Sequence, residues 1–142
     1  MDPRQPGEVQ ATGTLPISGE GTLAQAPESE RSRPDWVGEA RANLTVAGKY
    51  LAYEESGRRI VVPVSREWTR IGRSLAADVR FDDATVSRRH ALIVLSESGE
   101  LRALDDRSLN GLFVNGESVD WAPLGDGDEL EIGRYRVYVL EA

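Results

Sequence analysis

Short runs of apolar residues follow one another from Lys49 to the end of the chain. Turn-forming residues separate these runs, a pattern typical of an all-β sandwich rather than of helices. In the last run, Tyr135, Val137 and Val139 alternate with other residues, as expected of a strand with one buried face. We therefore predict strands at residues 50–54, 59–64, 69–71, 78–81, 91–95, 101–103, 112–114, 129–132 and 135–140.

The most specific turn signal is Asn115-Gly116, which directly follows the apolar residues Leu112-Phe113-Val114. A type I′ turn needs positive φ at both central positions, and asparagine followed by glycine satisfies this requirement best. We predict a β-hairpin at this place.

The first part of the chain has a different composition. Five of the seven prolines and five of the 14 glycines lie before residue 44, and Trp36 is the only aromatic residue there. Such a segment cannot bury enough apolar surface to offset the entropy lost on ordering. We predict a disordered tail at 1–43, with a short helical turn around 36–42, followed by a single domain at 48–142.

Composition excludes several kinds of function. The chain of 142 residues has no cysteine and a single histidine, His90, so thiolate catalysis and multi-histidine metal sites are excluded. The net charge of −7 argues against nonspecific nucleic-acid binding, which depends on counterion release by a basic surface. No apolar run is long enough to span a bilayer. We expect a cytoplasmic protein without catalytic activity, metal or cofactor.

Four short motifs lie at the ends of predicted strands or in the loops that follow. In this order and spacing, with Asp78 and Asp82 between the first two and Leu-x-Asp-Gly-Asp at 124–128, they resemble a forkhead-associated (FHA) domain. The resemblance covers about 48–142 and implies an eleven-stranded β-sandwich that binds phosphothreonine peptides through loops at one end. The motifs are Ile-Gly-Arg-Ser at 71–74, Val-Ser-Arg-Arg-His-Ala at 86–91, Ser-Leu-Asn-Gly at 108–111 and Leu-Phe-Val-Asn-Gly at 112–116.

Four residues are candidates for direct contact with a phosphopeptide. A phosphate dianion needs charge-assisted donors, and the planar guanidinium of Arg73, at the position of the family's Gly-Arg pair, supplies paired N–H groups. Ser87 offers a hydroxyl donor and Arg88 a second cation. The resemblance implies that Asn110 bonds the main chain of the peptide.

Three further residues are expected to support this site. Gly72 would allow a tight backbone turn, and Gly111 would permit the geometry of its loop. The resemblance gives His90 a structural role in holding the Ser87 loop, in preference to catalysis or metal binding. The motif departs from the common family pattern at Leu109, where many members carry a hydroxyl.

Some of these residues allow other interpretations. Arg73 could instead form an exposed ion pair with Asp78 or Asp82. The carboxylates near the C-terminus do not have the spacing of a calcium-binding EF-hand loop, and acidic residues in such a turn are usually solvated. Trp68 and Trp121 are most simply explained by packing in the core or at its rim. The carboxylates concerned are Asp126, Asp128, Glu129 and Glu131.

The resemblance predicts a phosphothreonine-binding adaptor that acts downstream of a Ser/Thr protein kinase. Its partners would be phosphothreonine-containing proteins, such as a kinase or its substrate. One alternative is a scaffold of the same fold that binds an unphosphorylated partner. Another resembles small actinobacterial regulators, in which the phosphorylated tail binds its own domain; Thr14, and then Thr12 and Thr22, are the candidate phosphorylation sites here.

Overall fold

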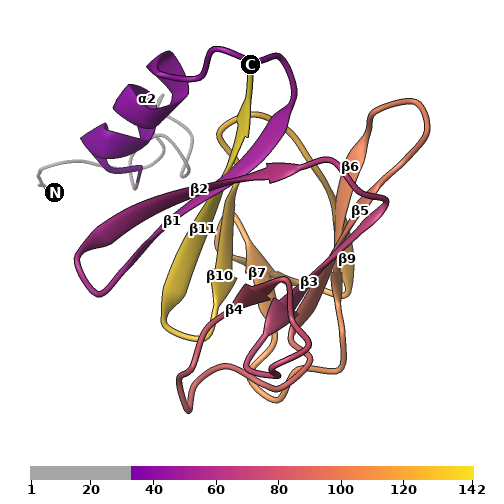
Figure 1. The fold of residues 1–142 in the computed structure, drawn as a ribbon. Helices are drawn as coiled ribbons and strands as arrows, with labels where there is room; N and C mark the ends of the chain where they lie inside the picture. The colour runs from indigo at the N-terminus through magenta and orange to yellow at the C-terminus, as the bar shows by residue number, and fades with distance from the viewer. Residues whose placement is uncertain (1–32) are drawn as a thin grey trace, which may run out of the picture. The chain divides into compact units, whose positions relative to one another are not determined.

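The computed structural model describes residues 33–142, which form a β-sandwich of two sheets (Figure 1). Sheet A has the strand order β2-β1-β11-β10-β7-β8, and sheet B has the order β4-β3-β5-β6-β9. All pairings are antiparallel except that of β3 with β4. The all-β prediction is confirmed. The strands are β1 Lys49–Glu55, β2 Arg58–Val64, β3 Trp68–Gly72, β4 Val79–Arg80, β5 Ala91–Leu95, β6 Leu101–Asp105, β7 Leu112–Val114, β8 Glu117–Val119, β9 Trp121–Leu124, β10 Glu129–Ile132 and β11 Tyr135–Glu141.

The predicted hairpin joins β7 and β8. Asn115 has a φ of 52° and Gly116 a φ of 86°, so both central residues have the positive φ of a type I′ turn. Val114 pairs with Glu117 across this turn. The hairpin prediction is confirmed, and it extends the sheet by β8, a strand that its own polar sequence did not indicate.

The core lies between the inner faces of the two sheets. Alternate residues of each strand point inward, and those near the centre are completely buried, as the period of a β-strand requires. Phe81, which follows β4, packs against Tyr53 and stacks on Tyr135 with ring centroids 4.2 Å apart. Fully buried members from both sheets include Leu51, Ile71, Ile93, Leu101, Leu112, Leu130 and Val139.

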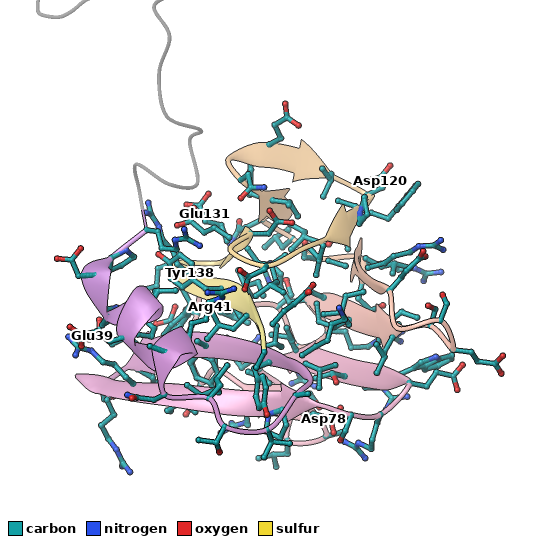
Figure 2. The ribbon with its side chains drawn as sticks, turned by 90° about the horizontal axis from the view of Figure 1, so that it is seen from above. Glu39, Arg41, Asp78, Asp120, Glu131 and Tyr138 are labelled. Atoms are coloured by element: carbon teal, nitrogen blue, oxygen red, sulfur yellow. The ribbon has the colours of Figure 1, made fainter. Side chains whose placement is uncertain are left out.

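A helix covers the outer face of sheet A. Helix α2, Asp35–Ala42, buries Trp36 and Val37 against Ala52, Tyr138 and Leu140. Trp36 meets the Tyr138 ring edge to face, with centroids 6.0 Å apart. Figure 2 shows Tyr138 between the helix and the sheet. Strand β11 is therefore buried on both faces, which explains why its sequence is more apolar than simple alternation requires.

Helix α2 corrects the predicted extent of the tail. Composition predicts a tail that ends near residue 43 and contains no more than a helical turn, yet residues 35–42 form a packed helix. The remainder of the predicted tail, including Thr12, Thr14 and Thr22, lies outside the described residues. Within residues 33–142, no helix has the length and hydrophobicity to cross a bilayer.

Sheet B has no such cover among the described residues. Trp68 in β3 and Trp121 in β9 lie on its outer face and are 49% and 58% exposed. The sequence predicts that both side chains pack in the core or at its rim. They do not belong to the core, because inward-pointing residues of the same strands, Thr69 and Leu124, occupy the buried positions.

Candidate functional site

Three loops meet at one end of the sandwich, at the bottom of Figure 1. They join β3 to β4 (73–78), β4 to β5 (81–90) and β6 to β7 (106–111). The amides of Arg73 and Ser74 donate to the carbonyls of Ser87 and Arg88, at 2.9 and 3.1 Å. These bonds fix the first loop against the second through the backbone alone, which leaves the side chains available for other contacts.

Gly72 makes this contact possible. It is the last residue of β3, and a Cβ at this position would collide with the carbonyl oxygen of Arg88. The sequence predicts a tight turn at this glycine, but the structure gives a different reason for it, which is the close approach of two backbone segments. Gly111 has a φ of 91°, in the region that favours glycine, so its contribution to loop geometry agrees with expectation.

His90 links the second loop to the third from a fully buried position. The amide of Ser87 donates to Nδ1 at 3.0 Å, and Nε2 lies 2.9 Å from the carbonyl oxygen of Gly111. Because Nδ1 accepts, Nε2 must carry the proton and donate, so the geometry requires the neutral Nε2–H tautomer. Both ring nitrogens are therefore used in holding backbone groups.

Ser87 and Asn110 connect the same two loops at the surface. The amide of Leu109 donates to Oγ of Ser87 at 2.8 Å, which leaves the hydroxyl proton of Ser87 for another acceptor. Asn110 donates one Nδ2 proton to the carbonyl of Thr85 at 3.0 Å. An amide has two N–H donors and a carbonyl, so Asn110 retains one donor and Oδ1 for a ligand.

The third loop has an internal brace that sequence reasoning missed. The amide and hydroxyl of Ser108 both donate to Oδ1 of Asp105, and Oγ of Ser108 accepts from the amide of Gly111 at 2.9 Å. Residues with short polar side chains commonly bond nearby backbone groups in loops. The serine that begins the motif at 108–111 was therefore the sequence signal from which this brace could have been predicted.

Arg73 and Arg88 line a cavity of about 350 Å³ between the first two loops. Nε of Arg73 donates to the carbonyl of Val86 at 3.0 Å, which orients the guanidinium. Within residues 33–142, the Nη groups of Arg73 and the guanidinium of Arg88 make no hydrogen bond or ion pair. Arg80 lines the same cavity, where its Nε donates to the carbonyl of Arg73 at 2.9 Å. Sequence reasoning missed Arg80.

Known proteins are similar to this chain in sequence and architecture. The sequence model of the FHA domain family matches residues 69–133. One solved structure, described as a structural and functional analysis of phosphothreonine-dependent FHA domain interactions, is 30% identical with a TM-score of 0.59. The match covers 66% of this chain and 96% of that chain. The chain belongs to the FHA domain family.

Two curated relatives of this FHA protein are regulators by name. The glycogen accumulation regulator GarA of Mycolicibacterium smegmatis is 50% identical over 72 residues, which cover 51% of this chain and 45% of the relative. The oxoglutarate dehydrogenase inhibitor of Corynebacterium efficiens is 44% identical over 72 residues, covering 51% and 50% of the two chains. The match thus spans about half the length of these relatives.

Aspartates brace the loops of this FHA domain from outside. Hydrogen bonds from the hydroxyl and amide of Thr85, together with Arg134, hold the pKa of Asp83 below its usual value. The amide of Arg134 donates in turn to Oγ1 of Thr85 at 3.1 Å, which ties the second loop to the turn between β10 and β11. The backbone N–H of Arg70, followed by Arg66, lowers the pKa of Asp78.

These contacts bear on the alternative interpretations. Asp78 pairs with Arg66 and Asp82 lies 3.7 Å from Arg80, so neither aspartate is paired with Arg73. Within residues 33–142, no group of three or more candidate ligands is arranged to hold a metal ion. The C-terminal carboxylates serve the fold instead: Asp128 accepts from the amide of Gly125 at 2.7 Å, and Glu129 from the hydroxyl of Tyr138 at 3.0 Å.

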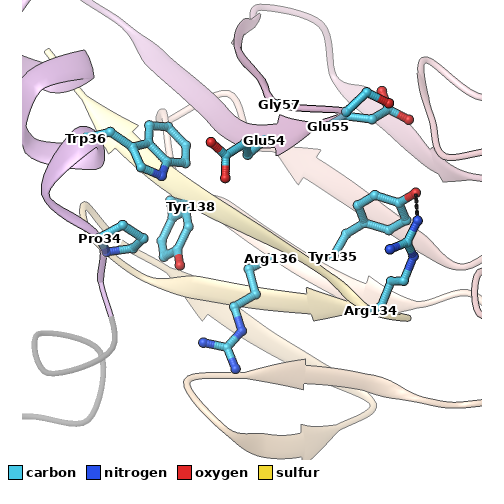
Figure 3. Close-up of a pocket in the computed structure, with 10 residues that line it drawn as sticks. Pro34, Trp36, Glu54, Glu55, Gly57, Arg134, Tyr135, Arg136 and Tyr138 are labelled. Carbon is cyan, nitrogen blue, oxygen red and sulfur yellow. Dashed lines mark hydrogen bonds between the residues drawn. The ribbon is translucent and has the colours of Figure 1, made fainter.

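A second, larger cavity of about 550 Å³, lined by no residue of the three loops, lies between α2, the β1–β2 turn and β11 (Figure 3). Trp36 and Tyr138 line one end and Arg134 and Tyr135 the other. Its cationic groups already have partners, since Arg134 pairs with Asp83 at 2.8 Å and Arg136 lies within 4 Å of two glutamates. The chemistry suited to a phosphorylated ligand is therefore at the loops.

Proposed function

We propose that this FHA domain binds peptides phosphorylated on threonine, with Arg73, Ser87, Arg88 and Asn110 as the contacting residues. One observation carries the proposal: the unused donors of Arg73, Ser87 and Arg88 project from loops whose backbones are already fixed. Such preorganisation lowers the entropic cost of binding. Asn110, with one N–H and Oδ1 available, would bond the main chain of the extended peptide.

The charge at the cavity supports a phosphate dianion as the ligand. Arg73, Arg80 and Arg88 bring three positive charges to its walls and Asp82 one negative charge. The sum of +2 complements a phosphothreonine, which carries about −1.5 to −2 near neutral pH. Arg80 enters this proposal through the structure alone.

The biological role proposed is that of an adaptor acting downstream of a Ser/Thr protein kinase. The ligand itself requires such a kinase, because phosphothreonine arises from its action. The two curated relatives are named for regulation of glycogen accumulation and inhibition of oxoglutarate dehydrogenase. We propose that this chain likewise acts by binding other proteins and not as a catalyst.

The site is tested by screening an oriented phosphothreonine peptide library on the chain and then titrating the best single peptide in a calorimeter. Hydrogen bonds to charged groups contribute about 1.5–3 kcal/mol each, so Arg73→Ala should weaken binding by one to two orders of magnitude. Arg89→Ala is the matched control, because Arg89 lies beside Arg88 but pairs with Asp106 at 3.0 Å. It should bind as the native chain does.

Ser87→Ala and Asn110→Ala should also weaken the peptide, the second through loss of main-chain contacts. A folded Arg73→Ala variant with undiminished affinity would remove Arg73 from the site. If no phosphothreonine peptide bound the native chain, the proposed function itself would be refuted.

A second candidate is recognition of an unphosphorylated protein by the same loops. Leu75 and Leu109 at the loop tips are 86% and 90% exposed, and apolar side chains in such positions can be buried by a protein surface. The direct test adds the unphosphorylated chain to an oxoglutarate dehydrogenase assay. Inhibition that is lost in Leu75→Ser or Leu109→Ser, without any phosphate present, would favour this candidate.

A further inference from the structure

The outer face of sheet B carries two rows of outward side chains that cross four strands. Their inward neighbours, such as Ile71, Ile93 and Ala103, are fully buried. Helix α2 covers the equivalent face of sheet A, whereas no described element covers this one. One row is Trp68, Val94, Arg102 and Pro123, and the other is Arg70, Leu92, Leu104 and Trp121. These eight residues are called the tryptophan face.

The composition of the tryptophan face is that of an interface. The outer face of an antiparallel sheet is normally polar, yet here Leu92, Val94 and Leu104 lie in the centre, with the two tryptophans toward opposite edges. A half-exposed tryptophan presents on the order of 100 Å² of surface. Tryptophan and arginine dominate the residues that contribute most to protein binding, while lysine, aspartate and glutamate are depleted.

The charge of the tryptophan face decides what kind of partner fits it. Neither row contains a carboxylate, and both contain an arginine. Arg102 lies over the ring of Trp121 at 5.8 Å, and Glu100, its ion-pair partner, is at 3.9 Å. The amide of Arg70 donates to Asp78, but its guanidinium forms no ion pair within residues 33–142. The eight residues of the face therefore carry a formal charge of +2, with the carboxylate of Glu100 beside Arg102 and that of Asp78 beside Arg70.

A second copy of the chain would fit this surface poorly. A two-fold dimer places the same patch against itself, which would bring four arginines together. Extension of the sheet is also disfavoured, because edge strand β9 contains Pro123 and the other edge strand, β4, has two residues. A partner would have to lie across the face.

We propose that the tryptophan face binds an acidic segment of another protein, in which carboxylates alternate with apolar side chains. The carboxylates would pair with Arg70 and Arg102, and the apolar side chains would pack on Trp68, Trp121 and the aliphatic residues between them. A cavity of about 450 Å³ beside Trp121 and Pro123 can accept a side chain of the partner. This surface is separate from the four residues proposed to hold a phosphopeptide, so one chain can bind both partners.

In the test, random unphosphorylated peptides are selected for binding to the full chain by display. The NMR spectrum of the chain is then recorded with each selected peptide. We expect the selected peptides to combine aspartate or glutamate with large apolar residues. They should shift the indole N–H signals of Trp68 and Trp121 and leave that of buried Trp36 unchanged. Affinity should fall at least about tenfold in Trp121→Ala and in Arg70→Glu.

A matched charge reversal at an exposed arginine of sheet A, Arg58→Glu, should bind as the native chain does. Peptides that bind equally to Trp121→Ala, or that are lost in Arg73→Ala, would overturn the proposal. So would self-association of the chain that Trp121→Ala abolishes, since the occupant would then be a second copy. Indole shifts of Trp68 and Trp121 on deletion of residues 1–32 would also overturn it, in favour of the chain's own N-terminal segment.

Discussion

Replacing His90 with phenylalanine tests whether its two hydrogen bonds hold the loop cluster together. Phenylalanine keeps an aromatic ring in the fully buried site but can neither accept from the amide of Ser87 nor donate to the carbonyl of Gly111. The substitution therefore removes the bonds with little change of shape. The two backbone groups would be left without their partner.

The expected loss of stability follows from those two groups. A buried donor or acceptor left unsatisfied costs about 1–3 kcal/mol, so the pair sets a range of about 2–6 kcal/mol. Ser87 and Gly111 are themselves only half-buried, so solvent can compensate in part. We expect a loss of about 2–4 kcal/mol from a total that is about 5–15 kcal/mol for ordinary domains.

Urea denaturation followed by tryptophan fluorescence measures this loss, with Arg89→Ala as the control. Arg89 precedes His90 in the sequence, and its own side chain is 75% exposed in the ion pair with Asp106. Ion pairs with such an exposed partner contribute about 0–1 kcal/mol. Binding of the best phosphothreonine peptide should weaken in His90→Phe even where the variant is fully folded, because Ser87 is no longer positioned. A loss below about 1 kcal/mol would refute the argument that these bonds hold the loops.

Four further predictions concern stability, pH and specificity. Trp36→Ala should lower the free energy of unfolding by about 3–5 kcal/mol in the same urea assay, because it removes a side chain that packs α2 on sheet A. Because the pKa of Asp78 is lowered in the folded chain, its carboxylate stabilises the fold fully above pH 3.8, the ordinary pKa of aspartate, and this stabilisation is lost as the pH falls below 3.8. In Asp78→Asn the free energy of unfolding should therefore depend less on pH in acid, as urea denaturation between pH 6 and 3 would show. Burial, and then Glu129, raise the pKa of Tyr138 to about 12. The native chain should therefore lose stability as the pH rises above 10, the ordinary pKa of tyrosine, and Tyr138→Phe should lose less, as alkaline urea titrations would reveal. Phosphothreonine peptides should bind about fourfold or more tightly than matched phosphoserine peptides, since burying one methyl group is worth about 0.8 kcal/mol; equal affinity in calorimetry would exclude a methyl pocket.

Nine of the eleven strands within residues 33–142, together with the loop motifs, could be predicted because their signals are local. A period of two residues identifies β11 from its own sequence, and Asn115-Gly116 specifies a turn with no help from the rest of the chain. The motif that contains Ser87 and His90 likewise carries its spacing within one loop. The structure shows the hydrogen bonds of both His90 ring nitrogens. The role of Arg73, Ser87, Arg88 and Asn110 in binding a phosphopeptide stays a prediction.

The remaining features depend on contacts between distant parts of the chain. Helix α2 is packed because Trp36 meets Ala52 and Tyr138, and nothing in the composition of residues 35–42 reveals those partners. Arg80 reaches the cavity only because β4, a strand of two residues, pairs in parallel with the end of β3. Strand β9 could not be predicted either, since an edge strand with proline gives a weak sequence signal.

The loop cluster separates the parts that keep it folded from the parts that a ligand would meet. Gly72 and His90 hold the backbones from within, whereas Leu75, Arg88 and Leu109 stand exposed at the tips, with side chains that form no hydrogen bond or ion pair within residues 33–142. Substitutions at the tips can therefore alter which sequences are recognised at almost no cost in stability. Because Gly72 and His90 keep the loop backbones in place, binding specificity can be diversified at the loop tips by natural selection or in the laboratory, as it is in the variable loops of an immunoglobulin sandwich.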